Sequence, residues 1–143
     1  MGYEFEALSG QIIEAAICVH RELGPGFLES VYESAMKVAL RHRGIVYQAQ
    51  REVTMVFEGE EVGTHRLDLV VEEQVVVEIK AVKALEDIYF AQVKSYLKAT
   101  RLKVGLLLNF NAPTLVIKRI VLSEHAASPS QSVTRPEEAD SAI

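Results

Sequence analysis

The sequence predicts an α/β (α+β) domain in which helices flank a mixed central sheet. Three segments carry apolar residues at helical spacing and five carry short β-branched runs, in the order ααβββαββ. The chain has 143 residues, of which 49% are hydrophobic and 24% charged, an ordinary mixture for one domain with a sizeable core. This order of elements is typical of helices packed on a sheet.

Two helices are expected at the start of the chain. The first, at 11–23, has an apolar stripe at i, i+3, i+4 and i+7 that ends in His20, and Ser9 is a suitable N-cap. A Gly-Pro-Gly sequence then interrupts the helical pattern. The second helix, at 28–43, ends with basic residues that complement the helix dipole and with Gly44 as a C-cap.

Five strands are expected, three before a third helix at 85–99 and two after it. Their ranges are 51–57, 62–71, 75–81, 103–109 and 115–122. Residues 72–74 indicate a tight turn between the second and third strands. After residue 122 the composition changes to Ser, Ala, Pro, Glu and Gln without an apolar period, so we expect a domain at 1–122 and a disordered acidic tail at 123–143.

The formal charge of −5 argues mildly against a general nucleic-acid binder, although part of it comes from the tail, so the domain could still carry a local basic surface. No apolar run approaches the ~20 residues that span a bilayer, and the start of the chain lacks the basic residues of a secretory signal. Cys18 is the only cysteine, so an internal disulfide is excluded. We therefore expect a cytoplasmic protein without a membrane partner.

Two carboxylates stand out because each lies in an otherwise apolar strand, Asp68 in the second and Glu78 in the third. Since side chains alternate along a strand, Leu67 is expected on the face opposite Asp68. A three-residue turn pairs residue 71 with residue 75 and so places Asp68 beside Glu78, with Cβ atoms about 4.5–5.5 Å apart. A slip of one residue would make the pair diagonal.

Two carboxylates at this short separation repel each other, and a hard cation such as Mg²⁺ between them would remove the repulsion. Such an ion positions and activates water and polarises a phosphoryl oxygen. Lys80, one pleat beyond Glu78, could orient that water or offset charge on a phosphate. The pattern favours a divalent-metal site for cutting phosphodiesters. The alternative is a solvated hairpin face with an acid–lysine salt bridge, although the apolar flanks favour a covered strand where unpaired charge is costly.

The third helix adds polar side chains to an apolar stripe. Gln92 lies within that stripe, four residues before Tyr96. A buried glutamine requires partners, so Gln92 could contact a metal-bound water, an acid or the substrate, or it could bond to backbone at the edge of the stripe. Tyr89 and Tyr96 are expected as core aromatic residues with their hydroxyls near polar atoms.

The first two helices add three further candidates. Glu29 and Tyr32 can face the same way on the second helix, although a first-turn glutamate also stabilises the helix dipole. His20 is either a ligand or a core histidine whose polar atoms are satisfied.

The segment Gly26–Tyr32 fits the pattern Gly-x-x-Glu-x-x-Tyr, and the chain resembles the bacterial and archaeal GxxExxY proteins. The stretches 19–26, 78–82 and 107–110 also look like this family, so the resemblance covers roughly residues 10–122. The family is grouped with the PD-(D/E)xK nuclease superfamily. The resemblance implies a restriction-endonuclease-like fold and a phosphodiesterase that depends on Mg²⁺ or Mn²⁺.

The resemblance also implies roles for particular residues. Asp68 corresponds to the metal-binding acid of the first motif strand, Glu78 to the second acid and Lys80 to the motif lysine. Glu29 corresponds to the acid of the preceding helix, and the carbonyl of Ile79 is available as a further metal ligand.

Gln92 and Tyr96 match the Gln-x-x-x-Tyr helix of an exonuclease-rich branch of the superfamily. Gln92 is thus a catalytic candidate, and Tyr96, Tyr32 and His20 are candidates for binding substrate. Leu67 stands where the motif name has proline.

The expected partner is nucleic acid, with DNA favoured, and hydrolysis is expected to leave a 5′-phosphate. The alternative is a non-catalytic nucleic-acid- or protein-binding subunit with the same fold, for which a small acidic domain would be suited. Exposed strand edges at 51–57 or 115–122 could also support a homodimer.

Overall fold

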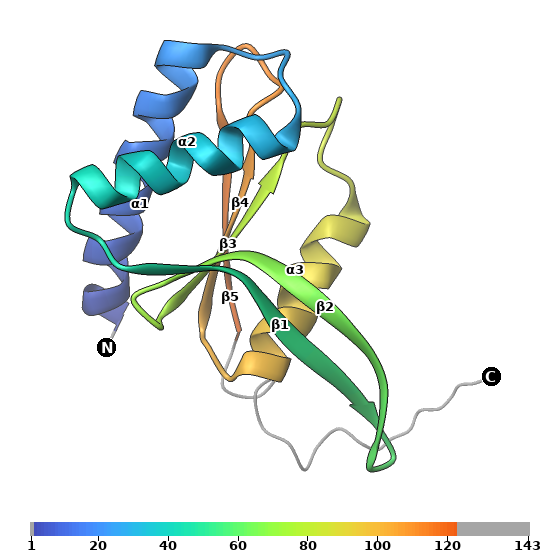
Figure 1. Ribbon diagram of the computed structural model, residues 1–143. Coiled ribbons are helices and arrows are strands. Elements are labelled where there is room, and N and C mark those ends of the chain that lie inside the picture. The colour runs from blue at the N-terminus through green and yellow to red at the C-terminus, as the bar shows by residue number, and fades with distance from the viewer. Residues whose placement is uncertain (1, 123–143) are drawn as a thin grey trace.

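The computed structural model describes residues 2–122 (Figure 1), so the tail expected at 123–143 lies outside the described residues. The helices and strands follow one another in the expected order ααβββαββ. Within 2–122, no helix is long and apolar enough to cross a membrane.

Helix α1 spans Gly2–Leu23 and therefore begins well before the expected range 11–23. Ser9 lies buried inside this helix, so the prediction that it is the N-cap is wrong. Of the expected stripe, Ala16 and His20 are buried, but Ile17 is 39% exposed and Ile12 is fully buried instead. The helix continues upstream because Leu8, one turn before Ile12, is also buried and extends the apolar face toward the N-terminus.

Helix α2 spans Glu29–His42, close to its expected range. Its C-cap is Arg43, and the next residue, Gly44, has a φ of +71°. A glycine just past the C-cap adopts this left-handed conformation without a steric cost, which is how Gly44 ends the helix.

The five strands form one sheet in the order β1-β2-β3-β4-β5, with β3 at its centre. Strands β3 and β4 are parallel and the other neighbours are antiparallel, so the sheet is mixed as expected. The strands are β1 Tyr47–Phe57, β2 Glu60–Val71, β3 Val75–Lys80, β4 Val104–Asn109 and β5 Val116–Val121.

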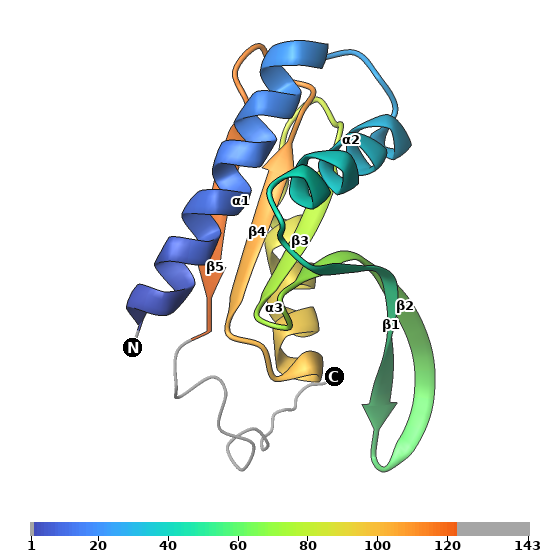
Figure 2. The same cartoon turned by 60° about the vertical axis from the view of Figure 1, so that its left-hand side comes forward.

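Helices cover both faces of the sheet, and each face has its own core. Helices α1 and α2 lie on one face and α3, at Asp87–Thr100, lies on the other (Figure 2). On the α3 side the contact is very close at Gly105 of β4, because a Cβ atom there would lie 2.6 Å from Cγ1 of Val93. The small residue at position 105 lets the helix approach the sheet.

The turn between β2 and β3 sets the register of their pairing. Glu72 and Glu73 have φ values of +53° and +54°, and Val71 pairs with Val75 as the three-residue turn predicts. Regular pairing continues to Leu69 opposite Val77 and then stops.

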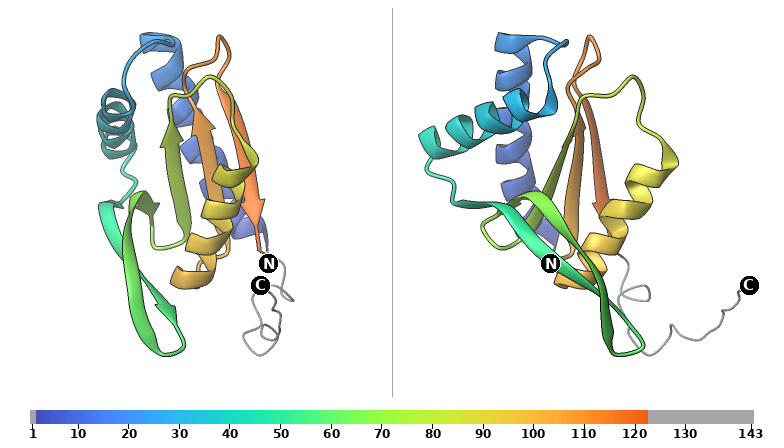
Figure 3. Two further views of the ribbon diagram at one scale, coloured as in Figure 1. Left: turned by 90° about the vertical axis from the view of Figure 1, so that its right-hand side faces the viewer. Right: turned by 45° about the vertical axis from the view of Figure 1, so that its right-hand side comes forward.

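Beyond that point the β1–β2 hairpin leaves the sheet and curves past α3 (Figures 1 and 3). Within the hairpin Gln50 has a φ of +56°, and the pairing passes from Ala49–Leu69 directly to Arg51–Leu67, which leaves Gln50 and Asp68 unpaired; the register itself shifts further out, between Met55 and Val56. In this part of β2, Leu67 packs in the α3-side core together with Val70, three residues later in the same strand. Strict alternation along β2 would put Leu67 and Val70 on opposite faces, and that expectation is wrong.

Candidate functional site

Asp68 and Glu78 form a carboxylate pair at the place where β2 and β3 separate. The backbone N–H of Asp68 donates to Oε2 of Glu78 at 3.1 Å, and the N–H of Ile79 donates to Oδ2 of Asp68 at 2.8 Å. Each carboxylate thus satisfies a backbone N–H of the neighbouring strand where the regular ladder ends. These two bonds hold both side chains between the strands.

The electrostatics of the carboxylate pair are unfavourable for two negative charges. Burial is the main cause that raises the pKa of Glu78 to about 8, and the charge of Asp68 raises it further. Burial is also the main cause that raises the pKa of Asp68 to about 6, against the hydrogen bond from Ile79, which lowers it. A positive charge placed between the two groups would therefore stabilise their ionised forms.

Lys80 is half-buried next to the carboxylate pair, and its ammonium Nζ lies 4.7 Å from the ring centroid of Tyr89. Its charge lowers the pKa of both acids. None of the ion pairs within 4.0 Å in residues 2–122 includes Lys80, so the structure does not show the alternative of an acid–lysine salt bridge. The ammonium faces an aromatic ring instead.

Helix α3 turns one face toward the carboxylate pair. Tyr96 is buried, and its pKa is raised to about 12 by burial and by the charges of Glu78 and Asp68. Gln92 is half-buried on the same helix, three residues after Tyr89 and four before Tyr96, so these three side chains share a face.

His65 of β2 stacks on Tyr96, with ring centroids 4.4 Å apart and an interplanar angle of 14°. Burial, followed by the charge of Lys80, lowers the pKa of its imidazole. His65 is not among the site residues that the sequence pattern predicts. It lies three residues before Asp68, and strict alternation would have placed it on the other face.

The first turn of α2 brings further acids to the site. Glu29 accepts a hydrogen bond from the N–H of Ala81 at 3.3 Å, and its charge raises the pKa of both members of the carboxylate pair. Glu33, one turn later, also raises the pKa of Asp68. Glu33 is not among the predicted site residues, although its spacing of four residues from Glu29 places both on one helix face.

Tyr32 and His20 make the contacts of core residues. The hydroxyl of Tyr32 donates to the carbonyl of Gly24 at 2.6 Å, and its ring stacks on Phe110 with centroids 4.7 Å apart. Nε2 of His20 donates to the carbonyl of Ala112 at 2.8 Å. Neither side chain has a described contact with the carboxylate pair, so a role in binding substrate stays a prediction for both.

Asn109 holds the segment that follows Lys80. Its Oδ1 accepts from the N–H of Val82 and its Nδ2 donates to the carbonyl of Val82, both at 3.0 Å. The N–H of Phe110 also donates to the carbonyl of Lys80 at 2.9 Å. The backbone on the C-terminal side of the lysine is therefore fixed to β4.

The donor set of the site suits a hard divalent cation. Within residues 2–122 no group of three or more His, Cys, Asp or Glu side chains is arranged to hold an ion. Asp68 and Glu78 nevertheless offer oxygen ligands that repel each other when both are ionised, and Mg²⁺ is commonly held by one or two carboxylates while water and phosphate fill its other positions. The residues present therefore fit Mg²⁺ or Mn²⁺.

A surface cavity of about 400 Å³ lies elsewhere, between α1 and the β2–β3 turn, and includes Gln11 and Glu72 in its lining. None of the candidate site residues borders it. The carboxylate pair therefore remains the candidate site.

Comparison with known proteins gives one family and one fold. A family model described as the PD-(D/E)XK nuclease superfamily matches residues 6–120. The crystal structure of SSO0001 resembles the chain with a TM-score of 0.53 and 16% sequence identity, over 68% of this chain and 52% of that chain. This chain therefore spans about half the length of that structure, and at this identity the likeness shows the fold alone. No curated protein matches the chain.

Proposed function

The chain belongs to the PD-(D/E)XK nuclease superfamily, and from this premise we propose that it is a metal-dependent nuclease that hydrolyses phosphodiester bonds in nucleic acid. The observation that carries the proposal is the carboxylate pair, two buried acids joined by hydrogen bonds across two strands, with the Lys80 ammonium beside them. Buried groups of this kind with raised pKa values are typical of functional sites. Membership of the GxxExxY group is part of the same proposal.

Mg²⁺ or Mn²⁺ would be held by Asp68 and Glu78, with Glu29 and the carbonyl of Ile79 as further ligands. When bound, such an ion supplies Lewis-acid polarisation of a phosphoryl oxygen and lowers the pKa of water. Two hydrogen bonds already fix the strand carboxylates, so little reorganisation is needed for them to act as ligands.

Lys80 would orient the attacking water and offset the charge that develops on the phosphate. The face of Tyr89 keeps its ammonium near the acids without an ion pair to either of them. Gln92 would orient the lysine or the substrate from the middle of the α3 face. Tyr96 would contact substrate, and Tyr32 and His20 are further candidates for binding it, although their described hydrogen bonds go to the carbonyls of Gly24 and Ala112. We propose DNA as the substrate and a 5′-phosphate as the product.

The test uses the purified full chain with Mg²⁺ or Mn²⁺ and end-labelled DNA and RNA, both single- and double-stranded. Lys80→Ala should lower the cleavage rate by about 10²-fold or more, because a positioned group that handles protons or charge contributes on that scale. Lys83→Ala is the matched control, since Lys83 is an exposed lysine three residues further along. Cleavage that survives in Lys80→Ala, with both variants folded by circular dichroism, contradicts the proposal.

A non-catalytic binding subunit is the second candidate function. The observation that favours it is the lack, within residues 2–122, of three side chains arranged to hold an ion. Nucleic-acid binding without metal that is equally strong in Asp68→Ala, together with no cleavage under any metal, would support this candidate over the nuclease.

A further inference from the structure

The aromatic stack of His65 and Tyr96 differs from an ordinary core contact because only one of its two residues is buried. The two rings are nearly parallel, with centroids 4.4 Å apart. Tyr96 is only 6% exposed, so it is held firmly on α3, whereas His65 is an exposed residue on β2. One face of the imidazole lies against Tyr96, and the residue as a whole is exposed despite this contact.

The aromatic stack borders the carboxylate pair. The charges of Glu78 and Asp68 act on the phenol of Tyr96, and the charge of Lys80 acts on His65. The stack therefore connects the proposed reaction site with the curved hairpin that passes α3 (Figure 3).

The position of His65 depends on the bend of that hairpin. β2 has no regular pairing with β3 before Leu69, so the part that carries His65 is free of β3 along that edge. Leu67 packs in the core beneath α3, and His65, two residues earlier in β2, points the same way. The curved hairpin thus presents a flat ring beside the carboxylate pair.

We propose that the exposed face of His65 is a stacking platform for an unpaired nucleobase, so that the enzyme acts on single-stranded nucleic acid. This inference rests on the proposed function and specifies its substrate class. An aromatic ring with one supported face and one open face accepts any base, because every base has a π-face. Inside a duplex both faces of each base are already covered by neighbouring bases, so the base that lies on His65 comes from an unpaired strand.

The charges around the stack agree with this placement. Lys80, the cation next to His65, suits the phosphate that follows the stacked base. The lowered pKa favours a neutral imidazole at pH 7, and a neutral ring stacks without acting as a phosphate ligand.

The test measures binding to oligonucleotides of 20 thymidines or 20 uridines and to a duplex closed at both ends by loops of abasic linker. Fluorescence anisotropy is recorded for the full chain in EDTA and again in Ca²⁺, so that the DNA and RNA arms are compared under both conditions. His65→Ala should weaken single-strand binding by about tenfold. His65→Phe should restore it, because phenylalanine keeps a flat ring on Tyr96, and Thr64→Ala, an exposed neighbour, should bind as the wild type does.

A second readout reports stacking directly. 2-Aminopurine is placed at successive positions of the single strand, and its emission should be quenched at one or two positions in the wild type and in His65→Phe. The quenching should be lost in His65→Ala. This readout does not depend on cleavage, so a protein that binds in this way but never cuts retains the platform while the nuclease proposal fails.

Three outcomes overturn the inference. The first is equal single-strand affinity in wild type and His65→Ala. The second is a loss of affinity that His65→Phe does not restore, which would assign the effect to hydrogen bonding or charge. The third is the absence of any preference for single strands in both EDTA and Ca²⁺, either because the closed duplex binds as tightly or because neither single strands nor duplex bind.

Discussion

Glu78→Gln should remove most of the pH dependence of stability in the metal-free protein. The pKa of Glu78 is about 8 in the folded chain against an ordinary value of 4.5. Between these two values the folded state holds a proton that the unfolded state has released, so the free energy of unfolding falls as the pH rises. The contribution is fully present below about pH 4.5 and is lost as the pH rises through about 8.

The size of the effect follows from the separation of the two pKa values. Each unit of pH between them corresponds to ~1.4 kcal/mol, so raising the pH from 5 to 8 lowers the free energy of unfolding on the order of 3 kcal/mol. For a domain of this size that is a fall of about 10 °C in melting temperature. The raised pKa of Asp68, about 6, acts in the same direction and leaves a smaller slope in the variant.

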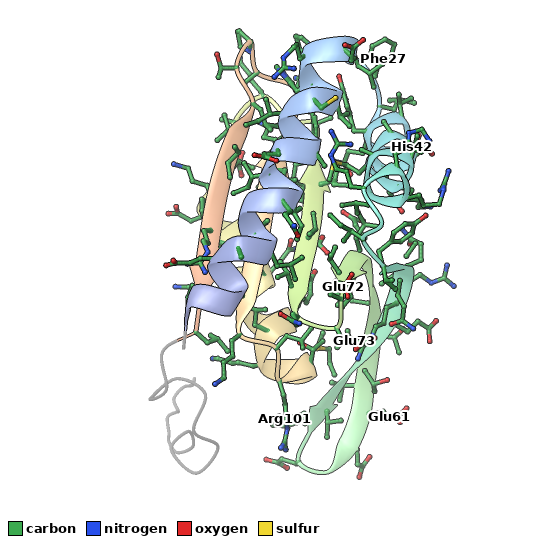
Figure 4. The ribbon with its side chains drawn as sticks, turned by 90° about the vertical axis from the view of Figure 1, so that its left-hand side faces the viewer. Phe27, His42, Glu61, Glu72, Glu73 and Arg101 are labelled. Carbon is green, nitrogen blue, oxygen red and sulfur yellow. The ribbon has the colours of Figure 1, made fainter. Side chains whose placement is uncertain are left out.

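The assay is thermal unfolding by circular dichroism in EDTA at pH 5, 6, 7 and 8. Wild type should lose stability steadily, and Glu78→Gln should lose less than half as much, because the amide keeps an oxygen for the N–H of Asp68 but carries no charge. Glu61→Gln removes an exposed charge from the same hairpin and should follow the wild type (Figure 4). Parallel melting curves for wild type and Glu78→Gln across this range would refute the reasoning. Mg²⁺ at pH 8 should raise the melting temperature of the wild type far more than that of the variant.

Two further substitutions test the surroundings of the site. Tyr89→Leu should slow cleavage several-fold, because it removes a cation–π contact of about 1 kcal/mol that positions Lys80. Tyr89→Phe keeps the ring and should keep the wild-type rate. Equal cleavage rates in the two variants would show that the ring does not position the ammonium. Gly105→Ala should lower stability by about 1–3 kcal/mol in urea unfolding, because its Cβ would lie 2.6 Å from Val93, and an unchanged midpoint would mean that α3 can move away at no cost.

Some features of the fold were predictable because their causes are local. Apolar periodicity specifies the order of helices and strands, and Gly44 marks the end of α2. The short turn at 72–74 sets the register that brings Asp68 toward Glu78, since pairing counts outward from the turn. Ser9 was misplaced because the start of α1 depends on the apolar face it packs against, which continues upstream of residue 11.

The chain by itself thus determines the elements, the family pattern and the carboxylate pair, all of which depend on neighbours in sequence or on one hairpin. Tertiary structure alone decides the cation–π contact of Lys80 with Tyr89 and the stacking of His65 on Tyr96, because each contact joins β2 or β3 to a helix on one face of the sheet. In the curved hairpin, Leu67 and His65 both lie on the α3 side of β2, which regular alternation from Val70 does not predict. An irregular strand interrupts the alternation of side chains, and the sequence pattern by itself does not reveal where the interruption occurs.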